Sequence, residues 1–336
     1  MGYKKSNYSG HVKCPHNSCS ANVKKLSPSA EIINYLFVNN DPDLVWEKAA
    51  TIIKRISPSY DLSHARGIFS DVVHLFHGKY PGYCPIKTPY HDLPHTLDVF
   101  LCAMRLMHGM HLSGTLMSDD EITLVIIATL MHDVGYAQRQ GEEAGTGAQH
   151  AQEHIQRGLE FMQSYLDERN FPHDFASRLE PIIYCSDPLL PLSRINFPNE
   201  RVRLLGQLAG TADLLGQLAD RVYLEKLLFL YQEFQEAGIG NYKNLHDLMH
   251  QTKKFYAIVQ NKLDGDFAAL YTKLSFHFKD TLGVENNYYM ESIEKNMTYL
   301  SQVIPLDESE YPSILRRGGI IRRAQSQREQ VMFKGP

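Results

Sequence analysis

Three features of the sequence predict an all-α fold. Apolar residues recur every three or four positions from residue 29 to about residue 305, which is the period of amphipathic helices. Alternating strand patterns are absent there, apart from the β-branched run Ile122–Met131, which is ambiguous on its own. The 336 residues are 43% hydrophobic and 21% charged, proportions typical of a globular chain with a large core.

Two short apolar runs, around 32–37 and 52–56, have helical spacing. A segment rich in proline and glycine, 78–89, predicts a loop ahead of Tyr90. Further helices are expected over 92–112, 119–133, 148–166, 173–185, 199–235, 243–262, 265–280 and 285–303.

The run Ile122–Met131 is interpreted as a buried helix. Three acidic residues, 119–121, precede it, and acidic side chains favour a helix N-terminus. Gly135 follows it as a candidate C-cap. It is the longest apolar stretch and has about half of the roughly 20 residues that span a bilayer, so no membrane segment is expected.

The chain is predicted to have three parts. Residues 1–28 form a flexible N-terminal leader, residues 29–305 form one all-α domain, and residues 306–336 form a basic C-terminal tail exposed to solvent. The leader contains His11, Cys14, His16 and Cys19. A zinc knuckle there is the less favoured alternative, because the spacing is loose and no second cysteine pair follows.

Charge and cysteine usage exclude several classes of protein. The net charge of −4 argues against nucleic-acid binding, which needs a basic surface. Five cysteines, an odd number scattered over the chain, do not suggest a disulfide framework. The first ten residues, MGYKKSNYSG, lack the apolar segment of a secretory signal. A cytoplasmic protein is therefore expected.

Two segments place histidine and aspartate beside apolar helical residues. In YHDLPHTLDV, residues 90–99, His91 and His95 are one turn apart and share a helix face that Asp98 continues. In LMHDVGY, residues 130–136, His132 and Asp133 follow the apolar helix. Because adjacent helical positions diverge by about 100°, these two can reach one ion only if it lies between them.

Two later segments add further candidates. AQEHIQRG, residues 151–158, contains His154, and His150 lies one turn earlier. GTADLLGQLADR, residues 210–221, places Asp213, Gln217 and Asp220 on one helix face. Taken singly, a histidine near an apolar run is more often a hydrogen-bonded core residue than a metal ligand. The stripe that begins at Asp213 is equally explained as the solvated face of a helix. Together, two imidazoles and two carboxylates form the mixed donor set that divalent Mn, Fe, Ni, Mg or Zn prefers.

The order of His95, His132-Asp133 and Asp213 is similar to the H…HD…D signature of the HD-domain metal-dependent phosphohydrolases, an all-α superfamily. YHDLPHTLDV resembles the Y-H-N-x-x-H-A-x-D-V opening of its class I cyclic-nucleotide phosphodiesterases. The resemblance covers roughly residues 60–240. It implies an HD-domain helical bundle with one divalent metal ion on His95, His132, Asp133 and Asp213.

The sequence also departs from the class I pattern. Asp92 stands in place of the asparagine, Thr96 in place of the alanine, and Tyr136 in place of a histidine that helps to hold a second ion. The 80-residue step from Asp133 to Asp213 is shorter than in the class I enzymes. His154, four residues before Gly158, resembles a step found in binuclear HD proteins. His154 and His150 are therefore candidates for a second metal or a phosphate, and a second ion is left open.

The resemblance also suggests roles for individual residues. It implies that His91 is the general acid and that Asp133 belongs to the catalytic centre. Asp98 and Gln217 are expected to orient the ligands. Arg139 is a candidate phosphate contact, although a solvated loop arginine is the commoner explanation.

The function expected from this reasoning is metal-dependent hydrolysis of a nucleotide phosphoester, in the first place a 3′,5′-cyclic phosphodiester. One alternative is hydrolysis of a non-cyclic nucleotide, such as a monophosphate, a triphosphate or an alarmone. Another is a degenerate HD domain that binds a nucleotide without turnover, which the intact set of four ligands argues against. The expected partner is a small nucleotide, and a homodimer is left open.

Overall fold

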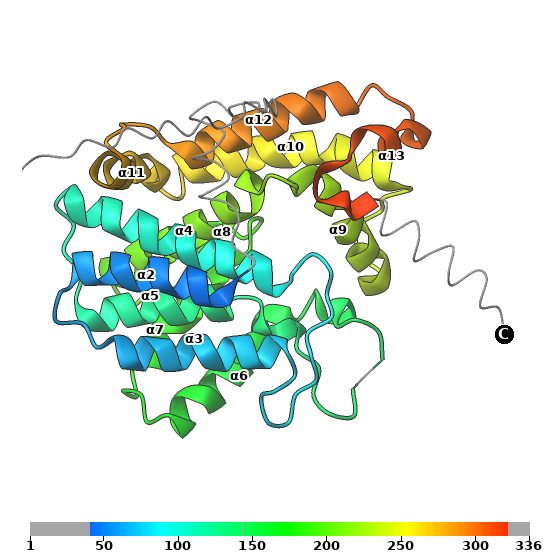
Figure 1. Cartoon of the computed structure of the whole chain (residues 1–336). Coiled ribbons are helices and arrows are strands. Elements are labelled where there is room, and N and C mark those ends of the chain that lie inside the picture. The colour runs from blue at the N-terminus through cyan, green and yellow to red at the C-terminus, as the bar shows by residue number, and fades with distance from the viewer. Residues whose placement is uncertain (1–40, 143, 322–336) are drawn as a thin grey trace, which may run out of the picture.

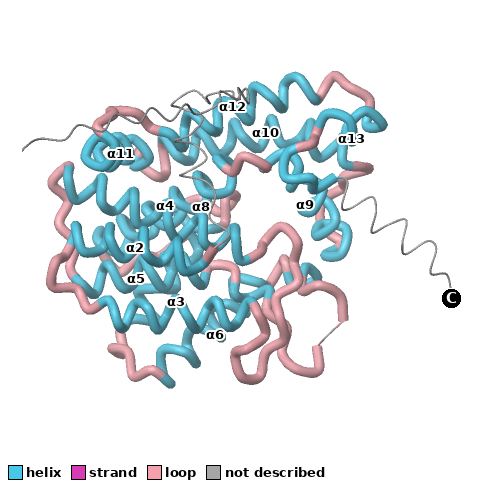
Figure 2. Tube along the Cα trace, viewed as in Figure 1, coloured by secondary structure: helices cyan, strands magenta, loops and turns pink. Residues whose placement is uncertain are grey.

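The structure, a computed structural model, describes residues 41–142 and 144–321, and all regular elements in these ranges are helices. They comprise 12 α-helices and several short 3₁₀ turns, with one isolated bridge between Tyr83 and Arg139. Figure 2 shows helices joined by loops, with no strand in the described residues. The prediction of an all-α fold is confirmed for this part of the chain.

The first six helices are α2 (Pro42–Ile56), α3 (Leu62–Phe76), α4 (Leu93–Leu112), α5 (Asp119–Met131), α6 (His154–Glu168) and α7 (Phe175–Ile183). The remaining six are α8 (Glu200–Ala219), α9 (Tyr223–Ala237), α10 (Leu245–Asp264), α11 (Leu274–Leu282), α12 (Tyr288–Val303) and α13 (Tyr311–Ile314). In Figure 1, α2 to α5 lie side by side, α8 lies behind α4, and α10 and α12 run along the upper edge.

Helices α4 and α8 form the centre of the bundle. Residues 95–97 and 99–110 of α4 are buried, so this helix is enclosed on almost every side. A Cβ atom on Gly216 of α8 would lie only 3.1 Å from the backbone N and Cα of Val99. Glycine at this position therefore lets the two backbones approach closely, which brings the first turns of α4 next to the last turns of α8.

Helix α5 is the buried helix that the sequence predicts. Residues 121–131 are all buried, as expected of a helix that is apolar on every side. Ser118 and Glu121 form a capping box at its start, and Arg201 of α8 donates two hydrogen bonds of 2.7 Å to the Glu121 carboxylate. The predicted C-cap at Gly135 is wrong, because α5 ends at Met131 and Gly135 lies in a 3₁₀ turn over Val134–Tyr136.

The single helix expected over 199–235 is two helices, α8 and α9. The side chains of Ser292 and Asn296 on α12 donate hydrogen bonds to the carbonyl groups of residues 218–220. Asp220 itself is extended and accepts a hydrogen bond from the backbone N–H of Val222. The carbonyl groups that would have continued α8 are thus satisfied by another helix.

The packed body extends past the boundary predicted at residue 305. Tyr311 and Leu315 are each 1% exposed, and Ile321 is also buried, so residues 311–321 are not the solvated tail that the basic composition suggested. The leader 1–28, with its histidines and cysteines, and residues 322–336 lie outside the described residues. Among the helices of the described ranges, none has the length and apolar character needed to cross a membrane.

The capping box of α5 gives a stability prediction. Replacing Ser118 by alanine removes the acceptor for the Glu121 backbone N–H and should lower the free energy of unfolding by about 1 kcal/mol. Urea denaturation measures this difference. Ser118→Thr keeps an acceptor oxygen and should remain close to the parent protein. Equal stability of Ser118→Ala and the parent would show that the cap contributes nothing.

Candidate metal centre

Three buried donor atoms from three parts of the chain meet at the centre of the bundle. His95 Nε2 comes from the first turn of α4, His132 Nε2 from the end of α5, and Asp213 Oδ1 from the middle of α8. All three lie within 4.8 Å of one another, and no other such group occurs in the described parts of the chain. The two imidazole nitrogens are 3.2 Å apart, and Asp213 Oδ1 is 3.6 Å from His95 Nε2.

Asp133 lies against the same group. Its Oδ2 atom is 3.0 Å from His132 Nε2 and 3.3 Å from His95 Nε2. Consecutive residues can point the same way here because the α-helix has already ended, and Asp133 has φ −108° and ψ 6°. The divergence of about 100° expected for neighbouring helical positions therefore does not apply.

The donor atoms have the spacing and orientation of ligands to one cation. Ligands held about 2.1 Å from a tetrahedral ion are about 3.4 Å apart, close to the separations found here. Nδ1 of His132 donates to the carbonyl oxygen of Thr129 at 3.0 Å, which leaves Nε2 facing the group. Asp133 Oδ2 and Asp213 Oδ1 are buried and accept no hydrogen bond. A buried carboxylate oxygen without a partner is costly, and a bound cation removes that cost.

The charges of these residues favour a cation as well. Burial raises the pKa of Asp213. Burial also acts to raise the pKa of Asp133, but the neighbouring His132 and His91 hold it well below its usual range. Burial acts to lower the pKa of His132, and the carboxylates of Asp133 and Asp213 outweigh it and raise the pKa to about 9. The two carboxylates therefore hold positive charge in this buried space. His95, His132 and Asp213 could hold one metal ion.

Of the two histidines predicted for a second ion, only His154 reaches the group. Its Nε2 atom lies 3.9 Å from Asp133 Oδ1, and its Nδ1 donates to the carbonyl oxygen of Ala151 at 2.7 Å. Burial lowers the pKa of His154, which favours the neutral ring with a lone pair on Nε2. His150 instead pairs with Glu153, with 2.8 Å between Nδ1 and Oε1.

Gly135 explains how His154 comes so close. A Cβ atom at Gly135 would lie 1.7 Å from the carbonyl oxygen of His154 and 2.8 Å from the backbone N of Gly158. Only glycine allows the turn after Asp133 to touch the first turn of α6. Arg157 strengthens this contact by donating to the carbonyl oxygens of Gly135 and Ala137.

His91 lies in a stack of aromatic rings beside the group. Its ring is parallel to that of Tyr136, with centroids 4.7 Å apart, and Tyr136 stacks on His154 at 4.8 Å. Tyr136, which stands where the class I pattern has a histidine, thus separates two imidazoles. Burial raises the pKa of Tyr136 well above its usual value, so the hydroxyl stays protonated.

Glu233 of α9 is the partner of His91. Its Oε2 is 2.6 Å from His91 Nδ1, and its Oε1 accepts from the backbone N–H groups of Tyr90 and His91. Burial acts to lower the pKa of His91, but the charges of Glu233 and Asp133 raise it to about 9. Sequence patterns alone do not single out Glu233. Its only signal is an acidic residue among the apolar residues of α9, where Glu225 is buried as well.

Three other predicted residues have different surroundings. Asp98 and Gln217 line a small cavity together with His95, so both are close to a ligand histidine. Arg139 is a surface residue whose guanidinium lies 3.5 Å from Glu160. Asp92 is the N-cap of α4, and its side chain accepts a hydrogen bond from the backbone N–H of His95.

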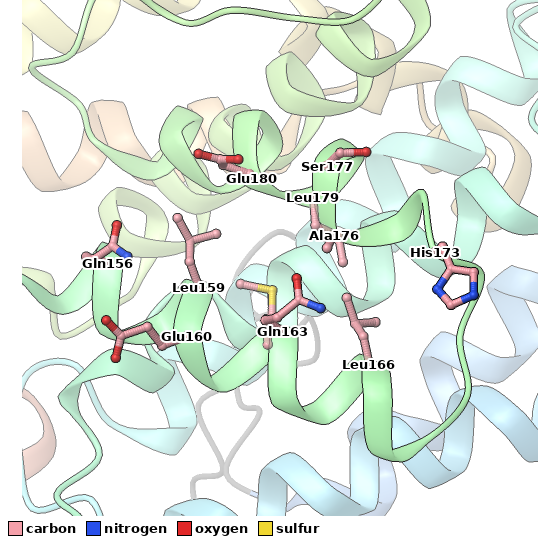
Figure 3. A pocket seen from close by; sticks show the side chains of 11 residues that line it. Gln156, Leu159, Glu160, Gln163, Leu166, His173, Ala176, Ser177, Leu179 and Glu180 are labelled. Carbon is pink, nitrogen blue, oxygen red and sulfur yellow. The ribbon is translucent and has the colours of Figure 1, made fainter.

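The surface groove drawn in Figure 3 gives no comparable site. The groove between α6 and α7, shown in Figure 3, has a volume of about 510 Å³ and is lined by such residues as Leu159, Gln163, Leu166 and His173. None of its lining residues belongs to the group described above.

Comparison with known proteins gives one result. The family described as Npun_R2479-like matches residues 186–295, about a third of the chain. The matched region contains Asp213 and Glu233 but neither His95 nor His132. No curated protein and no solved structure matches the chain.

The geometry predicts which residues are needed for metal binding. His132→Ala, Asp133→Ala and Asp213→Ala should each lose the bound divalent metal, because each removes a donor atom from the buried group. Elemental analysis of the purified proteins measures this loss. His150→Ala is the matched control and should keep the metal, since His150 pairs with Glu153 instead.

Circular dichroism of each variant separates loss of a ligand from loss of the fold, because a buried charge left without its partner also destabilises. Full metal occupancy in all three folded variants would exclude this assignment.

Proposed function

We propose that the protein is a metal-dependent phosphohydrolase of the HD type that hydrolyses a nucleotide phosphoester, in the first place a 3′,5′-cyclic phosphodiester. The observation that carries the proposal is the convergence of His95, His132 and Asp213 in one buried group, with Asp133 beside them. These are the residues that the H…HD…D order singles out in the sequence.

The residues divide into those that would hold the ion and those that would handle protons. His95, His132, Asp133 and Asp213 would hold a divalent cation. Such a cation supplies positive charge for the phosphoryl oxygens and acidifies water for attack on phosphorus. Nε2 of His132 is available for this role because the Thr129 carbonyl oxygen accepts the Nδ1 proton.

His91 would protonate the leaving oxygen. Its Nδ1 is engaged by Glu233, so Nε2–H remains as the donor toward a substrate. A pKa of about 9, set by burial against the stronger effect of Glu233 and Asp133, keeps the ring protonated at neutral pH. Stacking on Tyr136 fixes the plane of the ring. A ribose 3′-oxygen is a poor leaving group without a proton, so this arrangement suits a cyclic phosphodiester.

Turnover of a substrate panel tests the proposal. The metal-loaded protein should convert 3′,5′-cyclic nucleotides to 5′-monophosphates without releasing inorganic phosphate. Chromatography of the nucleotides and a phosphate assay measure the two products. Asp213→Asn, purified in parallel, should be inactive. Its inactivity would exclude a contaminating hydrolase as the source of the turnover by the parent protein.

The alternatives give different results in the same panel. Phosphate release from monophosphates, or cleavage of triphosphates or alarmones alone, would favour the non-cyclic reaction. Binding of nucleotides without any turnover by metal-loaded protein would favour a degenerate domain.

The role of His91 gives a second prediction. His91→Ala should keep its metal and lose roughly 10²–10⁴-fold in turnover of the natural ester, the usual contribution of a positioned acid. The loss should be smaller with bis-p-nitrophenyl phosphate, whose leaving group needs little protonation. His173→Ala, which changes an exposed histidine, is the control and should leave both rates unchanged.

Equal losses on both esters would indicate a structural role for His91 instead. Loss of metal together with activity would make His91 a ligand.

A further inference from the structure

A second pair of histidines lies on the first turns of α10, outside the group described above. His246 and His250 are one helical turn apart, with their Nε2 atoms 3.0 Å from each other and their ring centroids 4.6 Å apart. His250 is exposed and His246 is partly buried, so the pair opens to solvent. Two imidazoles at this spacing on one helix face are a recurrent half of a zinc site.

Tyr311 of α13 holds His246 in the orientation of a ligand. The Tyr311 hydroxyl lies 2.6 Å from His246 Nδ1, and the tyrosine is only 1% exposed. The two rings also stack, with centroids 5.9 Å apart. When Nδ1–H donates to this hydroxyl, the lone pair of His246 is on Nε2, facing His250. An outer partner of this kind is typical of histidines that bind metals.

Carboxylates line the space next to the pair. A cavity of about 590 Å³ is bounded by both histidines and by Asn244, Ile304, Pro305, Leu306, Asp307 and Glu308. Asp307 and Glu308 precede α13, which lies beside the N-terminal end of α10 in Figure 1. Hydrogen bonds from Ser309 hold the pKa of Asp307 below its usual value, so its carboxylate is ionised at neutral pH.

We propose that His246 and His250 supply two ligands to a divalent ion of the zinc class. Water completes the coordination, and a carboxylate of the same hollow, Asp307 or Glu308, joins it only by turning toward the ion, since neither lies within ligand distance of both histidines in this structure. Such an ion would connect the start of α10 to the segment 307–321. That segment is already attached to α9, where the Arg317 backbone N–H donates to the buried Glu225 carboxylate at 3.2 Å. The role of the ion is to fasten this segment to the bundle.

Zinc binding by metal-free protein tests the proposal. The measurement is made in the Asp133→Ala/Asp213→Ala background, which removes both carboxylates of the central group, so the result does not depend on the proposed function. This protein should bind one equivalent of Zn²⁺ in equilibrium dialysis, and its Tm should rise by about 4 °C at a hundredfold excess over Kd. Because Mg²⁺ prefers oxygen ligands, it should neither bind at this site nor raise the Tm.

Variants identify the ligands. His250→Gln and His246→Gln/His250→Gln should lose this equivalent and the rise in Tm. His74→Gln/His77→Gln, which changes two other exposed histidines, should keep both. His250→Gln leaves the hydrogen bond between His246 and Tyr311 in place, so loss of binding there cannot be ascribed to unfolding. Tyr311→Phe should bind about 10–100-fold more weakly.

Equal zinc stoichiometry in the parent and in His246→Gln/His250→Gln would overturn the proposal. His246 and His250 would then be linked only by the hydrogen bond between their imidazoles. The site is established if His74→Gln/His77→Gln keeps the bound zinc and His250→Gln loses it.

Discussion

The close packing of α4 against α8 is the constraint on which the central site depends. Gly216 allows the α8 backbone to approach Val99, and this contact sets Asp213 beside His95. Helix α5 is held in register by the link between Arg201 and Glu121, so its C-terminal end delivers His132 and Asp133 to the same point. The donor atoms come from separate helices whose relative positions are fixed by a close-packed core, and such cores tolerate little displacement.

Burial of charge is the second determinant. Asp133, Asp213 and Glu233 are all less than 10% exposed, and each lies against at least one imidazole. Carboxylates removed from water need a compensating positive charge or hydrogen-bond donors. Glu233 has its donors in His91 and two backbone N–H groups. Asp133 Oδ2 and Asp213 Oδ1 have none. This difference separates Glu233, whose hydrogen bonds are satisfied within the protein, from the two carboxylates suited to hold an ion.

Tyr136 sets the spacing of two imidazoles beside the central group. Its ring fills the space between His91 and His154, with nearly parallel planes at 17° and 13°. His154 still approaches Asp133 because Gly135 lets the two backbone segments touch. The site therefore has a histidine next to the second oxygen of Asp133 and an aromatic ring at the neighbouring position.

The sequence by itself determined the helical class, the buried character of α5, and the candidates His95, His132 and Asp213. Helical periodicity and residue type are local properties, and their order along the chain is enough to select these residues. Only the tertiary structure decided where α8 ends, because Asn296 and Ser292 reach its last carbonyl groups from a distant helix. It also decided that Glu233 pairs with His91, that His150 turns away to Glu153, and that residues 311–321 are packed. Each of these depends on contacts between residues far apart in the chain, or on which way a loop leaves a helix, and no local pattern encodes either.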